Sequence, residues 1–409
     1  MQYVEFAKSR FDAAIAEIQR LKHYEFPYPH IQDALDALAI VFGDRRKKLD
    51  FIASSLSPDV AKNACQQSLL FLFRFTPYLG FIVRSTNVRN AFELYPPLMR
   101  LARKALGKST KLLLSSEWDY SPFVFLPQKE LADFVIIGLP AFESSNALLI
   151  PLAGHELGHS IWKQQSLESK FKPKLEQAVL ESIVNRYWID FESYCPQATT
   201  TNLTTDIFVR EAWLPILTTA TRQLEEVYCD TMGARLFGES YLHAFAYLLA
   251  PGLEQSLNYP EISRRVRYLL DAAAKLGIAS PSDYLGLFQS QPLPANPVAK
   301  VFAGIAGTAI ESLVQDLVGE IVNFTNTQGL PERSNSEVKR ISHDFARIMP
   351  CEDGATLTDI INAGWQMYLD SQAWSNIPQL QRVDRVRVLN DLVLKSCEVA
   401  EYEERLRVS

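Results

Sequence analysis

The segment from Pro151 to Ile161, PLAGHELGHSI, places two histidines four residues apart in a run whose only other charged residue is Glu156. Residues four apart lie on the same face of an α-helix, so His155 and His159 can direct both imidazoles at one point. Apolar neighbours such as Leu157 indicate that the helix is buried. The spacing therefore predicts a buried helix that carries a paired-histidine site.

The pattern His-Glu-x-x-His is typical of zinc-dependent hydrolases. Neutral imidazole nitrogens bind Zn²⁺, and a glutamate that follows the first histidine lies beside the ion, where a general base is needed. We therefore predict His155 and His159 as metal ligands, Glu156 as the catalytic base, and one Zn²⁺ per chain. The alternative interpretation is a pair of core histidines on an apolar helix face.

A catalytic zinc site needs a third protein ligand and one open position. One class of zinc hydrolase supplies a third histidine in the pattern H-E-x-x-H-x-x-G-x-x-H. Here Trp162 and Gln165 occupy the positions of its glycine and its last histidine, which excludes that class. Another class takes a glutamate from a later helix, and the segment TRQLEEVYCDTMGARLFG offers two candidates.

The two candidates are Glu225 and Glu226, and they differ in the residue that follows four positions later. Asp230 follows Glu226, whereas Cys229 follows Glu225. A carboxylate on the same helix face as Glu226 can accept a hydrogen bond from the free ring N–H of a zinc-bound histidine, and we expect that histidine to be His155. We predict Glu226 as the third ligand, Asp230 as its supporting carboxylate, and Glu225 as the alternative ligand.

HELGH and the later EVYCD together resemble the Glu-zincin metallopeptidases, the thermolysin-like class with an E-x-x-x-D second motif. The resemblance covers only about residues 134–238. It implies a zincin-like catalytic core, a peptide or protein substrate, and attack by a water molecule that Zn²⁺ activates and Glu156 deprotonates. It also implies an edge strand upstream of the helix that pairs with extended substrate, for which Phe134–Leu139 is the best-placed segment.

The oxyanion that forms in such a reaction needs a hydrogen-bond donor besides the metal. The sequence identifies none directly. His343, beside Asp344, and Tyr368, in INAGWQMYL, are the candidates that the C-terminal region offers. The alternative for each is a structural role, because titratable and phenolic side chains indicate a site only when the geometry is known.

The overall pattern predicts a mainly α fold with a small β-sheet. Apolar residues recur at helical intervals in a region of residues 1–108 and again in residues 251–409. Between them, residues 109–250 form the expected catalytic core. Its short apolar runs are typical of buried strands and comprise Lys111–Ser115, Phe123–Leu126 and Phe134–Leu139.

Composition limits the partners and the compartment. A net charge of -6 over 409 residues gives no electrostatic reason to bind nucleic acid, and we expect the basic run Arg264–Arg267 to be a solvated helix face. The five cysteines are widely spaced and odd in number, which favours a reducing compartment. No secretory signal or membrane span is recognisable, so we expect a cytoplasmic protein.

These features favour a zinc metallopeptidase that acts on a restricted peptide or protein substrate, because the flanking helical regions would limit access to the site. One alternative is a non-catalytic zinc-binding interaction or regulatory protein. Glu156 argues against it, since a structural zinc site closes with four protein ligands and needs no base. Another alternative is a helical interaction protein with a chance motif. The sequence leaves the oligomeric state open.

Overall fold

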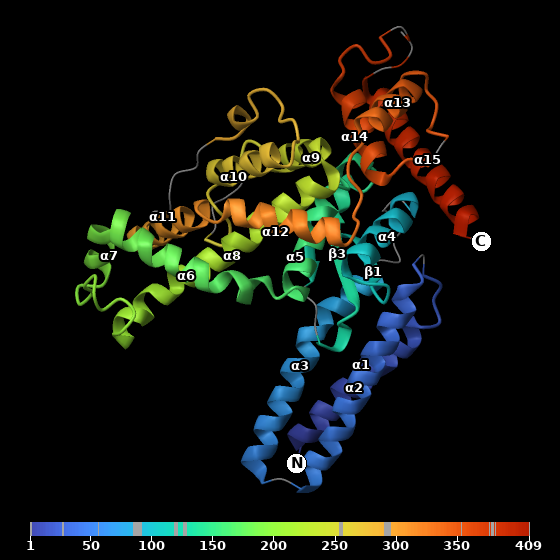
Figure 1. The fold of residues 1–409 in the computed structure, drawn as a ribbon. Coiled ribbons are helices and arrows are strands. Elements are labelled where there is room, and N and C mark those ends of the chain that lie inside the picture. The colour runs from blue at the N-terminus through green and yellow to red at the C-terminus, as the bar shows by residue number, and fades with distance from the viewer. Residues whose placement is uncertain are drawn as a thin grey trace. The chain divides into compact units, whose positions relative to one another are not determined.

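The computed structural model describes residues 2–408 except 27, 56, 85–91, 118–121, 126–128, 253–256, 290–295, 353, 376, 378–379 and 381. The described chain is mainly helical and contains one small, three-stranded sheet (Figure 1). The predicted fold class, mainly α with a small β-sheet, is confirmed in this form. The contacts divide the chain into two compact units.

Unit 1 comprises Met1–Tyr95 and Gly107–Ser145. Its first part is a set of long helices that pack side by side, as Figure 1 shows. Its second part is the sheet, in the order β1-β3-β2, with β3 parallel to β1 and antiparallel to β2. The elements are α1 (Gln2–Leu21), α2 (His30–Ser55), α3 (Pro58–Arg84), β1 (Lys111–Glu117), β2 (Phe123–Phe125) and β3 (Phe134–Pro140).

The strand predicted as the substrate-binding edge, Phe134–Leu139, is the central strand of the sheet. It pairs along its whole length with β1 and, from Ile136 to Gly138, with β2. The expectation of an edge strand there is wrong. Residues Phe134–Gly138 are buried. A strand that is covered on both faces is apolar along its length, so its sequence alone does not show how many neighbouring strands it has. Leu126, the last residue of the predicted neighbouring strand, lies outside the described residues.

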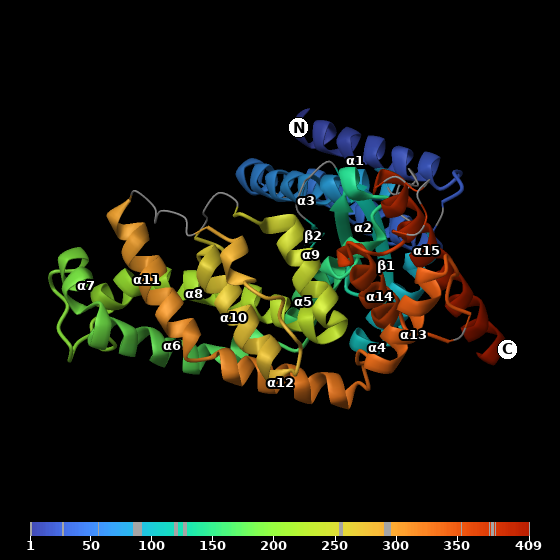
Figure 2. The same cartoon turned by 90° about the horizontal axis from the view of Figure 1, so that it is seen from above.

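Unit 2 comprises Pro96–Leu106 and Asn146–Ser409. In Figure 2, α11 and α12 run alongside α6 and α8, which they contact. Its helices are α4 (Tyr95–Leu106, of which Tyr95 belongs to unit 1), α5 (Leu152–Gln164), α6 (Leu167–Arg186), α7 (Trp188–Tyr194), α8 (Ile207–Phe237), α9 (Glu239–Leu249), α10 (Ile262–Lys275), α11 (Pro297–Glu311), α12 (Val314–Thr327), α13 (Asn335–Ala346), α14 (Leu357–Leu369) and α15 (Arg382–Val408).

This division differs from the predicted regions 1–108, 109–250 and 251–409. The sheet groups with the N-terminal helices, because β1 packs on α2 and α3. Helix α8, which carries EVYCD, packs against later helices such as α11 and α14. A core made only of residues 109–250 would leave that face of α8 exposed.

Helix α8 is the longest described helix and carries half of the candidate site. Its N-cap residue is Asp206. The Asp206 side chain accepts hydrogen bonds from the amides of Phe208 and Val209, which satisfies two free donors of the first turn. It continues through Pro215, and its C-cap residue is Gly238 with a φ of 62°. Glycine adopts this left-handed conformation without strain.

Helices α5 and α8 touch backbone to backbone at Gly158. A methyl group at this position would lie 2.9 Å from the Cα of Cys229. We expect Gly158→Ala to force the helices apart and to lower the free energy of unfolding by about 1–3 kcal/mol. Urea titration followed by tryptophan fluorescence measures this, because five of the six tryptophans lie in unit 2.

Gly319→Ala is the matched control, since Gly319 is exposed in α12 and a methyl group there would meet no atom within 4 Å. This variant should be as stable as the wild type or more stable by up to about 1 kcal/mol, the difference in helix propensity between glycine and alanine. Equal behaviour of the two variants would contradict the close contact at Gly158.

Among the described residues, no single helix combines the length and apolar character needed to cross a membrane. Only α11 and α12 taken together pass that test, by length and composition alone, and they meet at a bend of 52°.

Candidate metal centre

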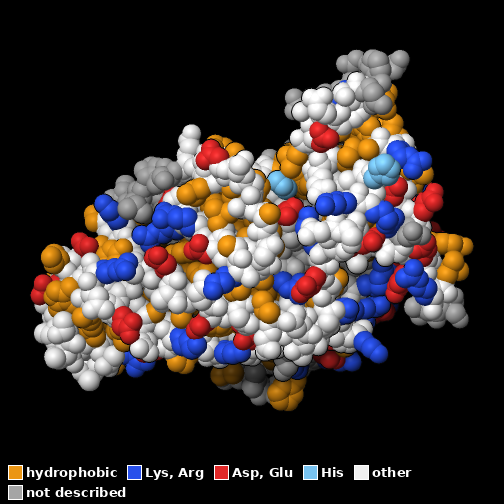
Figure 3. Space-filling view, turned by 45° about the horizontal axis from the view of Figure 1, so that its top comes forward, with side chains coloured by type: hydrophobic (Ala, Val, Ile, Leu, Met, Phe, Trp, Pro, Cys, Tyr) orange, Lys and Arg blue, Asp and Glu red, His pale blue; other side chains and the backbone are white. Residues whose placement is uncertain are grey.

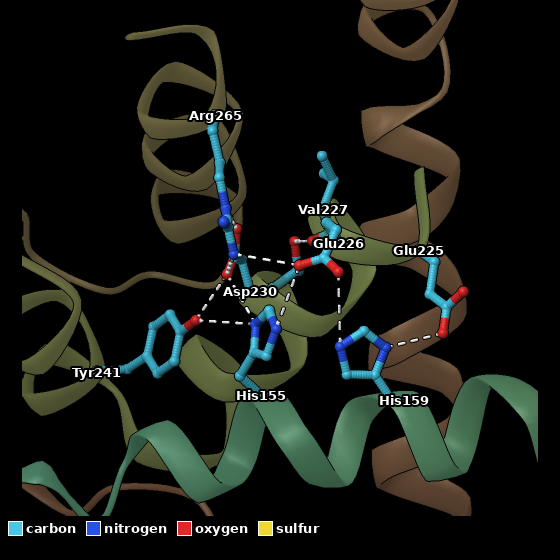
Figure 4. A network of polar contacts seen from close by, with 9 residues as sticks. His155, His159, Glu225, Glu226, Val227, Asp230, Tyr241 and Arg265 are labelled. Atoms are coloured by element: carbon cyan, nitrogen blue, oxygen red, sulfur yellow. Dashed lines mark hydrogen bonds and ion pairs between the residues drawn. The ribbon is translucent and has the colours of Figure 1, made fainter. Parts of the chain in front are cut away.

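The two histidines of α5 point at one carboxylate of α8, as Figure 4 shows. The Nε2 atom of His155 lies 3.4 Å from one oxygen of Glu226, and the Nε2 atom of His159 lies 3.7 Å from the other. His155 and Glu156 are buried, and His159 and Glu226 are nearly so. Three potential ligand side chains from two helices therefore converge on one point.

The spacing of these atoms fits a zinc ion. Ligand atoms about 2.0–2.1 Å from a tetrahedral Zn²⁺ are separated by about 3.3 Å from one another. The separations of 3.4 and 3.7 Å between the imidazoles and Glu226 are near this value, and each imidazole faces a different oxygen of the carboxylate. Two imidazoles and one carboxylate also form a donor set found in catalytic zinc sites, with a fourth position left for water or substrate.

The other ring nitrogen of each histidine is held by a second carboxylate. Nδ1 of His155 lies 2.9 Å from Asp230, the contact that the sequence spacing indicated. Nδ1 of His159 lies 2.8 Å from Glu225. These contacts orient both rings so that Nε2 faces Glu226. Glu225, the alternative ligand in the sequence analysis, is thus engaged with the nitrogen that points away from the convergence point.

Asp230 is the centre of a buried network that the sequence did not reveal. Arg265 in α10 donates to it from Nε at 2.6 Å and from an Nη at 2.9 Å, and the hydroxyl of Tyr241 in α9 donates at 2.8 Å. Burial by itself would raise the pKa of Asp230. The positive charge of Arg265 and the hydrogen bond from His155 outweigh burial and hold that pKa well below its usual range.

Arg265 contradicts the expectation that the run Arg264–Arg267 is a solvated helix face. Its side chain is buried, and it also lies 3.4 Å from the Glu226 carboxylate. Arg264 is half-buried, and Arg267 at the end of the run is exposed. A basic run cannot reveal which of its members meets buried carboxylates from a different helix, because that pairing depends on tertiary contacts.

The metal-free site stabilises a proton on His155. Burial lowers the pKa of His155, but its hydrogen bonds to Asp230 and Glu226 outweigh burial and raise that pKa to about 10. The pKa of Glu226 is lowered, since the hydrogen bond and the charge of His155 outweigh burial there too. A metal ion needs the neutral imidazole as a ligand, so it would replace this proton.

Glu156 differs from its acidic neighbours in having no fixed partner. It is 5% exposed, and no hydrogen bond or ion pair of its side chain occurs within the described part of the chain. Burial raises its pKa, while the positive charges of His155 and His159 act in the opposite direction. A carboxylate with a raised pKa and free oxygens beside a metal-ligand set is suited to accept a proton near neutral pH.

Cys229 is a second potential donor near the histidines. One ligand atom each of His155, His159 and Cys229 lie within 4.8 Å of one another. The thiol is fully buried against Gly158, and burial together with the surrounding carboxylates raises its pKa well above the ordinary value. The thiol is therefore protonated in the metal-free site and, like the proton on His155, this proton would leave if a metal ion bound there.

The structure does not bring the two predicted oxyanion donors to this point. Tyr368 packs against the indole of Trp365, with ring centroids 5.2 Å apart, on α14. His343 is exposed in the last turn of α13. Among the described residues, no contact joins either side chain to His155, His159 or Glu226.

Comparison with known proteins does not extend this picture. No family model matches the chain, and neither a curated protein nor a solved structure matches it. The convergence of His155, His159 and Glu226, with the free carboxylate of Glu156 beside them, is therefore the basis for a functional proposal.

Proposed function

We propose that this protein is a zinc-dependent metallopeptidase with His155, His159 and Glu226 as the metal ligands. The observation that carries the proposal is that both Nε2 atoms face the Glu226 carboxylate at 3.4 and 3.7 Å while both Nδ1 atoms are held by other carboxylates. A zinc ion at that point would polarise a substrate carbonyl and lower the pKa of a water molecule. The donor set fits that role because it leaves one position open.

The residues of the chain account for the remaining steps. Glu156 takes a proton from the attacking water and later gives that proton to the leaving amine. The raised pKa of Glu156 makes it a better proton acceptor than an ordinary carboxylate. Asp230 and Glu225 keep the two imidazoles in the orientation that binds metal. Arg265 balances the charge of Asp230 and Glu226, so that these two carboxylates can stay near one another.

The second candidate function is a non-catalytic, closed zinc site in a regulatory or interaction protein. The proximity of the Cys229 thiol to both histidines favours it, because a thiolate in the fourth position would close the site. The free carboxylate of Glu156 favours the catalytic site, since a zinc site closed by four protein ligands needs no general base.

Elemental analysis of the purified, zinc-dialysed chain tests both candidates. We expect about one zinc per chain in the wild type and in Cys229→Ala, and little or none in His159→Ala and Glu226→Ala, because two remaining ligands bind zinc weakly. Glu181→Ala, which removes an exposed carboxylate on α6, is the control.

Zinc in the wild type but not in Cys229→Ala would support the closed site instead. No zinc in the wild type would remove both candidates. If the open site is confirmed, a peptide library incubated with the zinc-loaded chain identifies the substrate class, which we expect to be restricted.

A further inference from the structure

The segment Leu257–Pro260, which leads into α10, is attached to the helix that carries the proposed ligand Glu226. Gln223 of α8 is buried and donates a hydrogen bond to the backbone carbonyl of Leu257 at 3.0 Å. Arg222 donates to the side chain of Asn258 at 3.4 Å. These contacts fix the segment one turn before Glu226 along α8, close to the candidate site.

Within this segment, Tyr259 lies next to the charged network of the site. The guanidinium carbon of Arg265 is 5.1 Å from the centroid of the Tyr259 ring. The same guanidinium contacts Glu226 at 3.4 Å and Asp230 at 2.6 Å. One side chain therefore links the phenol ring to a proposed metal ligand and to the carboxylate behind His155.

Tyr259 is also free to meet a substrate. It is 46% exposed, and its hydroxyl makes no hydrogen bond within the described part of the chain. The other tyrosine at the site, Tyr241, is buried and bound to Asp230. Figure 3 shows basic, acidic and apolar side chains interspersed over the face that it presents. Surface charge on that face therefore does not indicate where a substrate would bind.

The surrounding charges keep the Tyr259 hydroxyl protonated. The negative charge of Glu226, followed by burial, raises the pKa of Tyr259 to about 12, and Glu156 and Asp230 act in the same direction against Arg265. A phenol in this state is a hydrogen-bond donor at neutral pH.

We infer that Tyr259 is a catalytic residue that donates a hydrogen bond to the substrate oxygen that becomes negatively charged. The inference rests on the proposed function. The water oxygen bonds to the carbonyl carbon while its proton passes to Glu156, and the carbonyl π electrons move to the oxygen that Tyr259 contacts. When the C–N bond breaks, the C=O bond reforms and the amine takes the proton from Glu156. This assigns to Tyr259 the role predicted for His343 or Tyr368.

The test is Tyr259→Phe in the full chain, with Tyr402→Phe, which alters an exposed tyrosine on α15, as the control. With zinc loaded and a peptide chosen from the library, we expect kcat to fall by about 100-fold or more and KM to change little, as for other lost oxyanion donors. The zinc content should equal that of the wild type.

A second readout does not need a substrate. The cobalt(II)-loaded chains are titrated with methylphosphonate, a tetrahedral anion, and binding is followed by the cobalt absorption spectrum. We expect binding to Tyr259→Phe to be about tenfold weaker or more, since hydrogen bonds to charged groups contribute that much, and binding to Tyr402→Phe to be unchanged.

Unchanged kcat and unchanged methylphosphonate affinity in metal-loaded Tyr259→Phe would overturn the inference and leave the proposed function intact. A wild-type chain that binds no metal overturns the proposed function itself, and the inference with it, and the metal analysis distinguishes that case.

Discussion

Glu156→Gln should lower peptide hydrolysis by about 1,000-fold while the zinc content stays at about one per chain. A positioned general base contributes about 100- to 10,000-fold to a reaction rate, and glutamine preserves the shape of the side chain but cannot accept the proton. Glu156 has no partner within the described chain, so its replacement breaks no ion pair. The measurement is kcat on a library-selected peptide, together with elemental analysis of the same preparation.

Glu168→Gln is the control for this change, because Glu168 is an exposed residue of α6. It should leave both the rate and the zinc content unchanged. If Glu156→Gln hydrolysed the peptide as fast as the wild type, Glu156 would not be the base. Loss of zinc from Glu156→Gln would instead mean that this carboxylate is a ligand.

Asp230→Ala should destabilise metal-free unit 2 by about 3–5 kcal/mol, the effect of removing one partner from a buried ion pair. Asp230 is almost fully buried and accepts hydrogen bonds from both Arg265 and Tyr241. Without it, the longer contact with Glu226 is the remaining ion pair of the guanidinium among the described residues. Urea unfolding followed by tryptophan fluorescence measures the difference.

The pH dependence of this difference follows from the lowered pKa of Asp230. A carboxylate with a depressed folded-state pKa contributes stability that is present above its unfolded pKa of about 4 and is lost as the pH falls through the folded value. The gap between wild type and Asp230→Ala should therefore persist at pH 5 and shrink only in stronger acid.

Asp316→Ala is the matched control, because Asp316 forms an exposed ion pair with Lys174 on the surface of the same unit. Exposed pairs contribute little to stability, so this variant should unfold at nearly the wild-type urea concentration. An equal loss of unfolding free energy in both variants would show that the buried network contributes no more stability than an exposed ion pair.

The sequence predicts the local parts of the site well, because helical spacing alone brings His155 and His159 to one face and Glu226 and Asp230 to another. It does not predict the parts that depend on tertiary packing. Arg265 reaches Asp230 from a helix that begins after a loop, and nothing in its basic run marks it. Tyr259 precedes that helix in an irregular segment, where no periodicity applies.

The sheet illustrates the same limit. Short apolar runs identified its strands, but strand order is set by pairing between segments. A run such as Phe134–Leu139 therefore does not show whether it lies at the centre or at the edge. The two compact units also combine segments far apart in the chain, because the elements that pack together are not neighbours in the sequence. The close contact between Gly158 and Cys229 likewise joins segments that lie far apart in the chain.

The contact between Gly158 and Cys229 also decides what holds the proposed ligands at their spacing. Both histidines and Glu226 belong to helices whose separation is set by backbone packing, so the protein itself imposes the distances that an incoming ion encounters. Small zinc-dependent domains work the other way, because the metal supplies their folding energy. Under the proposed function, ions whose preferred bond lengths do not match the spacing of His155, His159 and Glu226 should bind more weakly than zinc.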